Sequence, residues 1–224
     1  MEESVFIIDQ GTGCGRKISE SFLSGGYRVI ATEIENSESR AAHTEEDRFI
    51  KLNWNCFSPF SSKNVILGLR LYNKIKYSII IFSSPEADLP LFRQNNAEIQ
   101  KSIDFYIKSQ VLITRELLTE LARQKPSLLF LVLESRGNGS TAYRQFFRAF
   151  INNLLKEKET NGITINAFET GTESTETFAK YVFSTIQGRG SRAKGKWFKK
   201  FSFLNYMLNP FGLDMFQVKE SNQE

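Results

Sequence analysis

Short apolar segments and longer amphipathic segments alternate along this chain. The apolar segments are rich in β-branched and aromatic residues, and each is continuous enough to be buried on both faces of a parallel sheet. Six of them are predicted strands, at residues 4–8, 27–32, 48–52, 77–82, 128–133 and 163–167. Because helical patterns separate several of these strands, the order of elements indicates strand-helix-strand units.

Two of the helical segments have broad apolar faces. Residues 96–124 carry apolar side chains at spacings of three, four or seven, and residues 143–155 carry a wide stripe of aromatic and aliphatic side chains. Shorter helices are predicted at residues 16–23 and after the candidate N-caps Ser174 and Thr175. We expect the two broad helices to pack on the sheet and also on another subunit, giving a homo- or hetero-oligomer.

The pattern as a whole predicts one α/β domain in three layers, with a doubly wound parallel sheet between helices. The expected strand order is 3-2-1-4-5-6. The domain would span residues 1–186, and residues 187–224 would form a basic and aromatic C-terminal extension.

Composition narrows the classes of function. The chain has 224 residues, of which 41% are hydrophobic and 24% charged, as in ordinary soluble globular proteins. A signal peptide and a membrane-spanning segment are not expected, so the sequence predicts a cytoplasmic protein, with membrane association as an alternative. Two cysteines and one histidine, His43, argue against a metal site and against histidine-based catalysis.

The net charge of +4 is unevenly distributed. Residues 187–200 carry six lysines and arginines and no acid, and aromatic residues follow them. The simplest interpretation is that the apolar residues of this extension cover the protein's own sheet or a partner subunit. The alternatives are a peripheral membrane contact through residues 187–216 and, less favoured, binding of nucleic acid.

A glycine-rich turn follows the first predicted strand, in the stretch FIIDQGTGCGRKI. Gly11, Gly13 and Gly15 would let the backbone approach a diphosphate at a helix N-terminus. The alternative is a tight turn that only needs glycine conformations. Glu33, 18 residues after Gly15, ends the second strand where a carboxylate accepts hydrogen bonds from an adenosine ribose, which favours NAD over NADP.

From this point the sequence resembles the short-chain dehydrogenase/reductase family, which has a Rossmann fold and begins with T-G-x-x-x-G-x-G. The stretch ITINAFETG at residues 163–171 is similar to that family's R-V-N-x-x-x-P-G. Asn53 matches an aspartate after the third strand, and residues 81–84 match its N-N-A-G. The glycine-rich turn and the resemblance together assign these positions to a cofactor, NAD or NADP: Gly11, Gly13, Gly15, Arg16, Glu33, Asn53, Ser83, Gly171 and Thr175.

The resemblance also marks catalytic positions, and two of them have changed. The family uses a tyrosine activated by a lysine four residues later, with a serine and an asparagine. Tyr143 and Ser135 match the tyrosine and the serine, whereas Phe147 stands in the lysine's place and Tyr106 in the asparagine's. As an alternative, Tyr143 is a core aromatic residue and Ser135 a turn residue.

Asp9 is a further departure, because it replaces the first glycine of the family's turn. Its carboxylate would repel a diphosphate unless it is protonated, turned away or paired, with Arg16 as one candidate partner. We therefore expect a catalytically degenerate homologue that acts as a non-catalytic partner, scaffold or nucleotide sensor. The alternatives are an active oxidoreductase that uses Tyr143 and Ser135, and a membrane- or nucleic-acid-binding module.

Overall fold

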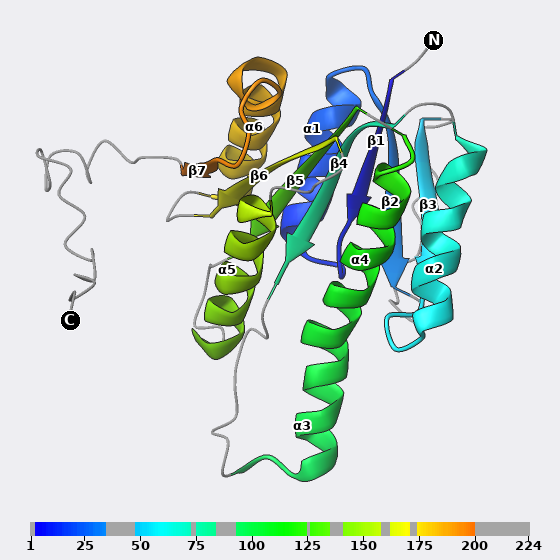
Figure 1. Ribbon diagram of the computed structural model, residues 1–224, viewed down its shortest axis with the longest axis vertical. Coiled ribbons are helices and arrows are strands. Elements are labelled where there is room, and N and C mark those ends of the chain that lie inside the picture. Colours follow the sequence, from blue (N-terminus) through cyan, green and yellow to red (C-terminus); the bar gives the residue numbers. More distant parts are fainter. Residues whose placement is uncertain are drawn as a thin grey trace, which may run out of the picture.

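Seven parallel strands form the centre of the molecule, in the order β3-β2-β1-β4-β5-β6-β7 (Figure 1). The structure is a computed structural model, which describes residues 3–34, 48–72, 75–83, 93–124, 126–134, 141–157, 162–170 and 174–199. The strands are β1 (Ser4–Ile8), β2 (Arg28–Ile34), β3 (Phe49–Trp54), β4 (Ile75–Phe82), β5 (Ser127–Leu133), β6 (Ile163–Glu169) and β7 (Trp197–Lys199). The expected sheet and the order of its first six strands are confirmed, and β7 extends the sheet by one edge strand.

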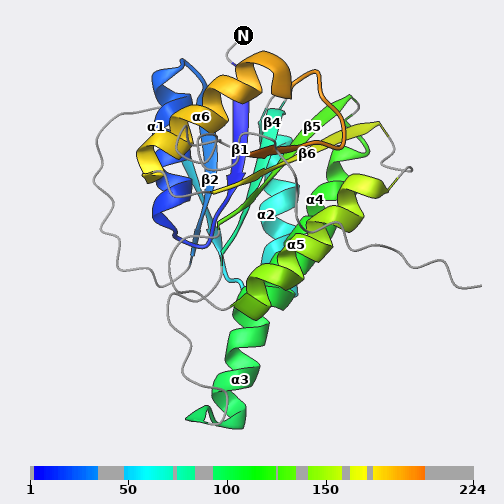
Figure 2. The same ribbon diagram turned by 90° about the vertical axis from the view of Figure 1, so that its left-hand side faces the viewer.

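Helices cover both faces of this sheet, so the fold is a three-layer, Rossmann-like α/β/α arrangement (Figure 2). One face packs against α1 (Gly13–Ser24) and α6 (Thr175–Thr185). The other face packs against α2 (Pro59–Gly68), α4 (Ser109–Leu121) and α5 (Thr141–Lys156).

Each central strand supplies side chains to both layers. In β1, Phe6 and Ile8 belong to the core beneath α2, α4 and α5, whereas Val5 and Ile7 belong to the core beneath α1 and α6. All four side chains are fully buried. The continuous apolar runs in the sequence arise from this double burial, because alternate residues of a parallel strand point to opposite faces.

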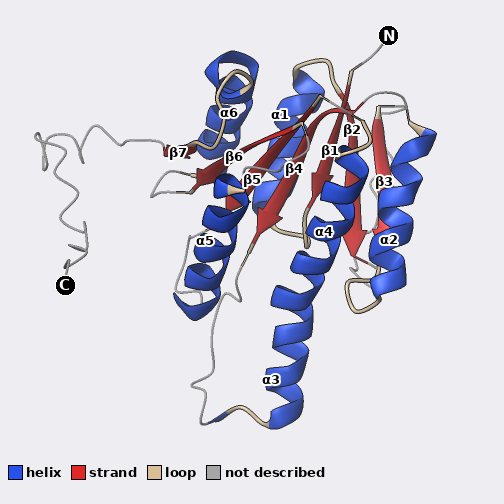
Figure 3. Ribbon diagram, viewed as in Figure 1, coloured by secondary structure: helices blue, strands red, loops and turns tan. Residues whose placement is uncertain are grey.

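The helix expected over residues 96–124 is present but contains an irregularity. It begins as α3 (Asn96–Ser102), passes through a π-helical turn over Ile103–Lys108 and continues as α4. Neither α3 nor the π-helical turn contains a buried residue. In Figure 3, α3 extends well past the ends of the strands. This end of the helix therefore has a large surface that the sheet does not cover.

Helix α2 was not among the predicted elements. Its sequence PFSSKNVILG has polar residues early and apolar residues late, without the regular spacing that marks an amphipathic helix. Local signals define its start: Ser58 accepts a hydrogen bond from the Ser61 amide, and Pro59 occupies the first turn.

Candidate functional site

The turn between β1 and α1 lies at the carboxyl edge of the sheet, where the strand order reverses between β1 and β4 and where doubly wound folds bind ligands. Thr12 is the N-cap of α1, and its hydroxyl accepts a hydrogen bond from the Gly15 amide at 3.2 Å. Gly11 has a φ of 83°, a left-handed conformation that favours glycine.

The Asp9 carboxyl group packs onto this turn. One oxygen accepts a hydrogen bond from the Thr12 amide at 2.8 Å, and the other accepts one from the Thr12 hydroxyl at 2.7 Å. The backbone of Asp9 is fixed by Thr32 in β2, whose hydroxyl bonds both its N–H and its carbonyl oxygen at 2.9 Å. The predicted partner Arg16 instead has Glu20 at 3.9 Å.

The position of Asp9 explains the glycine at position 15. A Cβ added to Gly15 would lie 2.4 Å from the Asp9 carboxyl carbon and from one of its oxygens. The carboxyl group therefore lies directly against the first turn of α1. At Gly13 an added Cβ would meet no atom within 4 Å.

Burial changes the acidity of Asp9. The residue is only 7% exposed, and loss of solvation raises its pKa from 3.8 to about 7. The hydrogen bonds from Thr12 act in the opposite direction, and the nearby charge of Glu134 raises the pKa further. Near neutral pH the group is thus present in both its neutral and its charged form.

A pocket of about 610 Å³ opens beside this turn, between α1, the carboxyl-terminal half of β2 and the amino-terminal half of β3. Its lining includes Asp9, Arg16, Glu33 and Lys51, together with the predicted Gly11, Gly13 and Gly15. Glu33 accepts a 2.8 Å ion-paired hydrogen bond from Lys51. The structure therefore brings together five of the predicted cofactor positions, and it adds Lys51, which the sequence did not single out.

Three other predicted positions are not part of the lining of this pocket. Asn53 is exposed near the end of β3, and its register partner is Glu33. Ser83 is buried directly after β4, and Thr175 is the first residue of α6, after the confirmed N-cap Ser174. The predicted residues Ser135 and Gly171 lie outside the described residues.

The position expected for the catalytic lysine is part of the hydrophobic core. Phe147 is fully buried, and its ring centroid lies 4.9 Å from that of Phe82 at the end of β4. On the same helix, Arg148 forms an ion pair with Glu169, which also has Lys199 at 3.3 Å. This ion pair therefore holds the Arg148 guanidinium group at the end of β6.

Tyr143 lies among aromatic side chains. Its ring is 5.7 Å from the ring of Tyr106, in an edge-to-face arrangement, so these two predicted positions do lie together. Tyr106 is 4.8 Å from Phe105, which is 5.7 Å from Phe57. The four rings form a row that links the loop after β3, the π-helical turn and α5.

Gln10 connects the glycine-rich turn to this row, a contact that the sequence analysis missed. Its side-chain amide donates to the Phe105 carbonyl oxygen at 2.7 Å and to the Ser109 hydroxyl at 2.9 Å. The Phe105 carbonyl oxygen also accepts a hydrogen bond from the Ser109 hydroxyl, so Gln10 joins a contact that lies within the π-helical turn and the start of α4. No local signal in the sequence marks a contact between residues 95 positions apart.

Metal-binding and membrane-spanning features were also sought in the described part of the chain. It contains no cluster of three or more histidine, cysteine or acidic side chains arranged to hold a metal ion. Cys14 and Cys56 are both buried free thiols. None of the described helices has both the length and the apolar character needed to cross a bilayer.

Comparison with known proteins identifies no family for this chain. The sequence matches no protein-family model, and a search of curated proteins gives no significant match.

Proposed function

We propose that this protein is a catalytically inactive relative of the short-chain dehydrogenases/reductases, acting as a non-catalytic partner, a scaffold or a nucleotide sensor. The proposal depends mainly on one observation, namely that position 147 holds a fully buried phenylalanine. A tyrosine at position 143 needs a cation on the same helix face to lower its pKa, and the residue four positions later is a phenylalanine packed on Phe82.

The environment of Tyr143 supports the same conclusion. Its neighbour Tyr106 stands where the resemblance expects an asparagine, and the two rings pack edge to face. Arg148, five residues after Tyr143, forms an ion pair with Glu169. Tyr143 is thus part of an aromatic cluster, and the position four residues after it holds a phenylalanine in place of a cation.

The residues around the glycine-rich turn fit a dinucleotide poorly. An ionised Asp9 would repel a diphosphate at the N-terminus of α1, and its oxygens already accept the Thr12 amide and hydroxyl. A ribose would have to compete with Lys51 for the Glu33 carboxylate. The pocket of about 610 Å³ is nevertheless large enough for a smaller nucleotide or nucleoside, which keeps a sensor role among the proposed functions.

The uncovered helix surfaces favour a partner or scaffold role. Ile103 is 40% exposed and Phe146 is 38% exposed, although both are large apolar residues. They lie on the two helical segments expected to form a subunit contact, around residues 96–124 and 143–155. Binding of another chain would remove this apolar surface from water.

The test is a paired measurement on the purified protein. NADH and NADPH oxidation are followed with a generic carbonyl substrate, and NAD, NADP and adenosine are titrated by calorimetry. We expect no oxidation above a control without enzyme. Heat of binding would support the sensor role, and its absence would favour the partner or scaffold role. NADH oxidation that Tyr143→Phe abolishes would instead establish an active oxidoreductase with a rearranged site.

A further inference from the structure

The segment at residues 187–199, here called the basic loop, differs in charge pairing from the rest of the described surface. It carries Arg189, Arg192, Lys194, Lys196 and Lys199 and no acidic residue. Elsewhere many of the cations face carboxylates, in pairs such as Lys17–Glu20, Lys51–Glu33, Arg70–Glu120, Lys76–Glu3, Lys108–Asp104, Arg115–Glu116 and Lys180–Glu176. Within the loop only Lys199 has an acidic partner among the described residues, namely Glu169.

The basic loop is held in a defined shape by one buried side chain. Asn166 in β6 is fully buried, and its amide group donates to the carbonyl oxygens of Gly190 at 3.2 Å and Ala193 at 2.8 Å. Its side-chain oxygen accepts from the Lys196 amide at 3.0 Å. The four cations of the loop that have no acidic partner among the described residues therefore lie on a backbone of defined shape.

Glycines make this shape accessible to the chain. A Cβ at Gly190 would lie 2.8 Å from the Thr185 carbonyl oxygen, so only glycine permits this close approach. Gly195 has a φ of 67°, in the left-handed region. The spacing of small and basic residues in QGRGSRAKGKWFK thus combines a tight backbone path with outward-facing charge.

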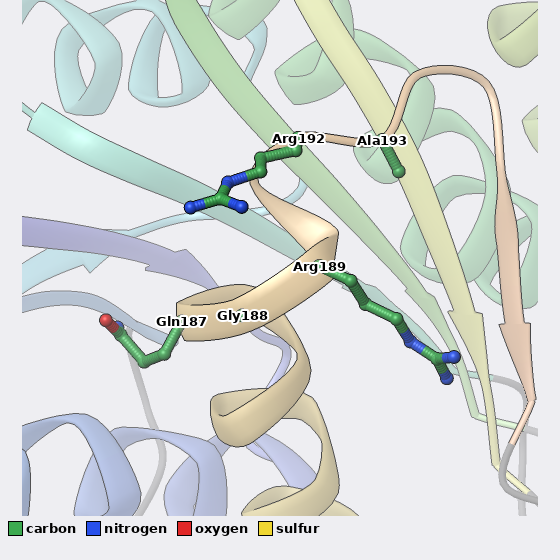
Figure 4. A pocket seen from close by; sticks show the side chains of 5 residues that line it. All are labelled: Gln187, Gly188, Arg189, Arg192 and Ala193. Carbon is green, nitrogen blue, oxygen red and sulfur yellow. The ribbon is translucent and has the colours of Figure 1, made fainter.

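The arrangement of the arginines indicates what kind of anion fits. Arg189 and Arg192 flank a pocket of about 500 Å³, but their side chains extend in opposite directions from the loop (Figure 4). Arg189 lies over the ring of Phe198 at 5.6 Å. Two diverging guanidinium groups cannot grip a single phosphate between them, whereas they suit a surface on which negative charges are spread out.

We propose that the basic loop binds the surface of an anionic phospholipid bilayer. The chain supplies apolar side chains directly after the cations, since Phe201, Phe203, Leu204, Met207 and Leu208 follow Lys200 in sequence. Basic residues beside aromatic and aliphatic ones are the composition of peripheral membrane contacts.

Nucleic acid fits the described part of the loop less well. Stacking on bases needs exposed rings, and the two aromatic residues of the loop are engaged. Phe198 is 8% exposed, and the Trp197 indole N–H donates to the Asn152 side-chain oxygen at 2.8 Å.

The experiment measures co-sedimentation of the full chain with vesicles of phosphatidylcholine, with and without phosphatidylserine. The test variant combines Arg189→Gln, Arg192→Gln and Lys194→Gln. The matched control combines Lys63→Gln, Lys101→Gln and Lys156→Gln, three exposed lysines on other elements. Each basic residue near an anionic surface contributes about a fivefold factor in binding, so the test variant should bind about a hundredfold more weakly. The control variant should bind like the wild type.

Several results would overturn the proposal. They are no binding to phosphatidylserine vesicles, equal binding to vesicles of phosphatidylcholine alone, or equal losses in the two variants. A gel-shift titration with single-stranded RNA forms a second arm. If the wild type binds RNA more tightly than phosphatidylserine vesicles and the test variant loses that binding, the partner is a nucleic acid instead. Matching thermal melts for all three proteins ensure that each is folded.

Discussion

At the scale of single residues, Asp9 couples stability to pH. Its carboxyl group is buried and keeps its proton to about pH 7, whereas in the unfolded chain it ionises near pH 3.8. Its contribution is therefore most favourable below pH 3.8 and declines as the pH rises to 7. The size of this decline is about 4 kcal/mol, because each pKa unit corresponds to about 1.4 kcal/mol.

Replacing Asp9 by asparagine removes this titration while keeping the size of the side chain. We expect Asp9→Asn to unfold at higher urea concentration than the wild type at pH 8, with the difference shrinking toward pH 4. The control is Asp104→Asn, which removes a half-buried carboxylate that pairs with Lys108 at 3.1 Å and whose pKa is lowered by hydrogen bonds from Gln100 and Lys108. That variant should gain nothing at pH 8. A difference between Asp9→Asn and the wild type that does not change with pH would contradict the assignment.

Phe147 gives a second prediction at the residue scale. Phe147→Lys would place an ammonium group beside the ring of Phe82 in a fully buried position, which costs several kcal/mol without a partner. We expect a markedly lower melting temperature and no NADH oxidation. Phe146→Lys is the matched control, because Phe146 is 38% exposed and a lysine there can reach water. Restored turnover in Phe147→Lys would show that the site had kept its other catalytic groups.

At the scale of elements, the turn between β1 and α1 packs closely around the Asp9 side chain. Gly15→Ala would place a methyl group 2.4 Å from the Asp9 carboxyl carbon, and such overpacking costs about 1–3 kcal/mol. The double variant Asp9→Gly with Gly15→Ala should tolerate the methyl group better than the single variant does. Gly13→Ala, where the new Cβ meets no neighbour within 4 Å, serves as control. Urea unfolding of the wild type, Asp9→Gly, Gly15→Ala and the double variant checks this coupling, and strictly additive effects would rule it out.

The elements also show what the sequence can and cannot predict. Five of the six predicted strands are visible because most of their residues are buried on both faces, and the edge strand β3 is visible from its short apolar run. Strand β7 has only three residues and lies among polar ones. The phenylalanine at position 147, where the resemblance expects a lysine, and the presence of Asp9 are also visible in the sequence. The partners of Asp9 and Gln10 are not, because Thr32 and Phe105 reach them only through the fold, across 23 and 95 residues. The π-helical turn could not be predicted either, because the apolar residues keep a regular helical spacing through it.

At the scale of the whole molecule, the apolar surface beyond the sheet predicts self-association or a partner. We expect light scattering at micromolar concentration to give a mass above that of a monomer. Ile103→Glu combined with Phe146→Glu should shift the protein toward the monomer, since both residues are about two-fifths exposed. Ser24→Glu combined with Ser184→Glu is the control, because these exposed polar residues lie on α1 and α6, over the opposite face of the sheet, and should not change the mass. A monomer for the wild type would exclude a homo-oligomer.

The pairing of β7 with β6 has a consequence for local unfolding. Ala167 donates its amide to the Lys196 carbonyl oxygen at 2.8 Å, and Gly195 donates to Ile165 at 2.9 Å, so the edge strand and the basic loop share one set of hydrogen bonds. A three-residue strand at an edge is among the first parts of a sheet to open. When it opens, the cations lose their fixed spacing while the six-stranded sheet remains folded. Amide hydrogen exchange should therefore show Gly195, Lys196 and Ala167 exchanging together, well before the amides of β1 and β4.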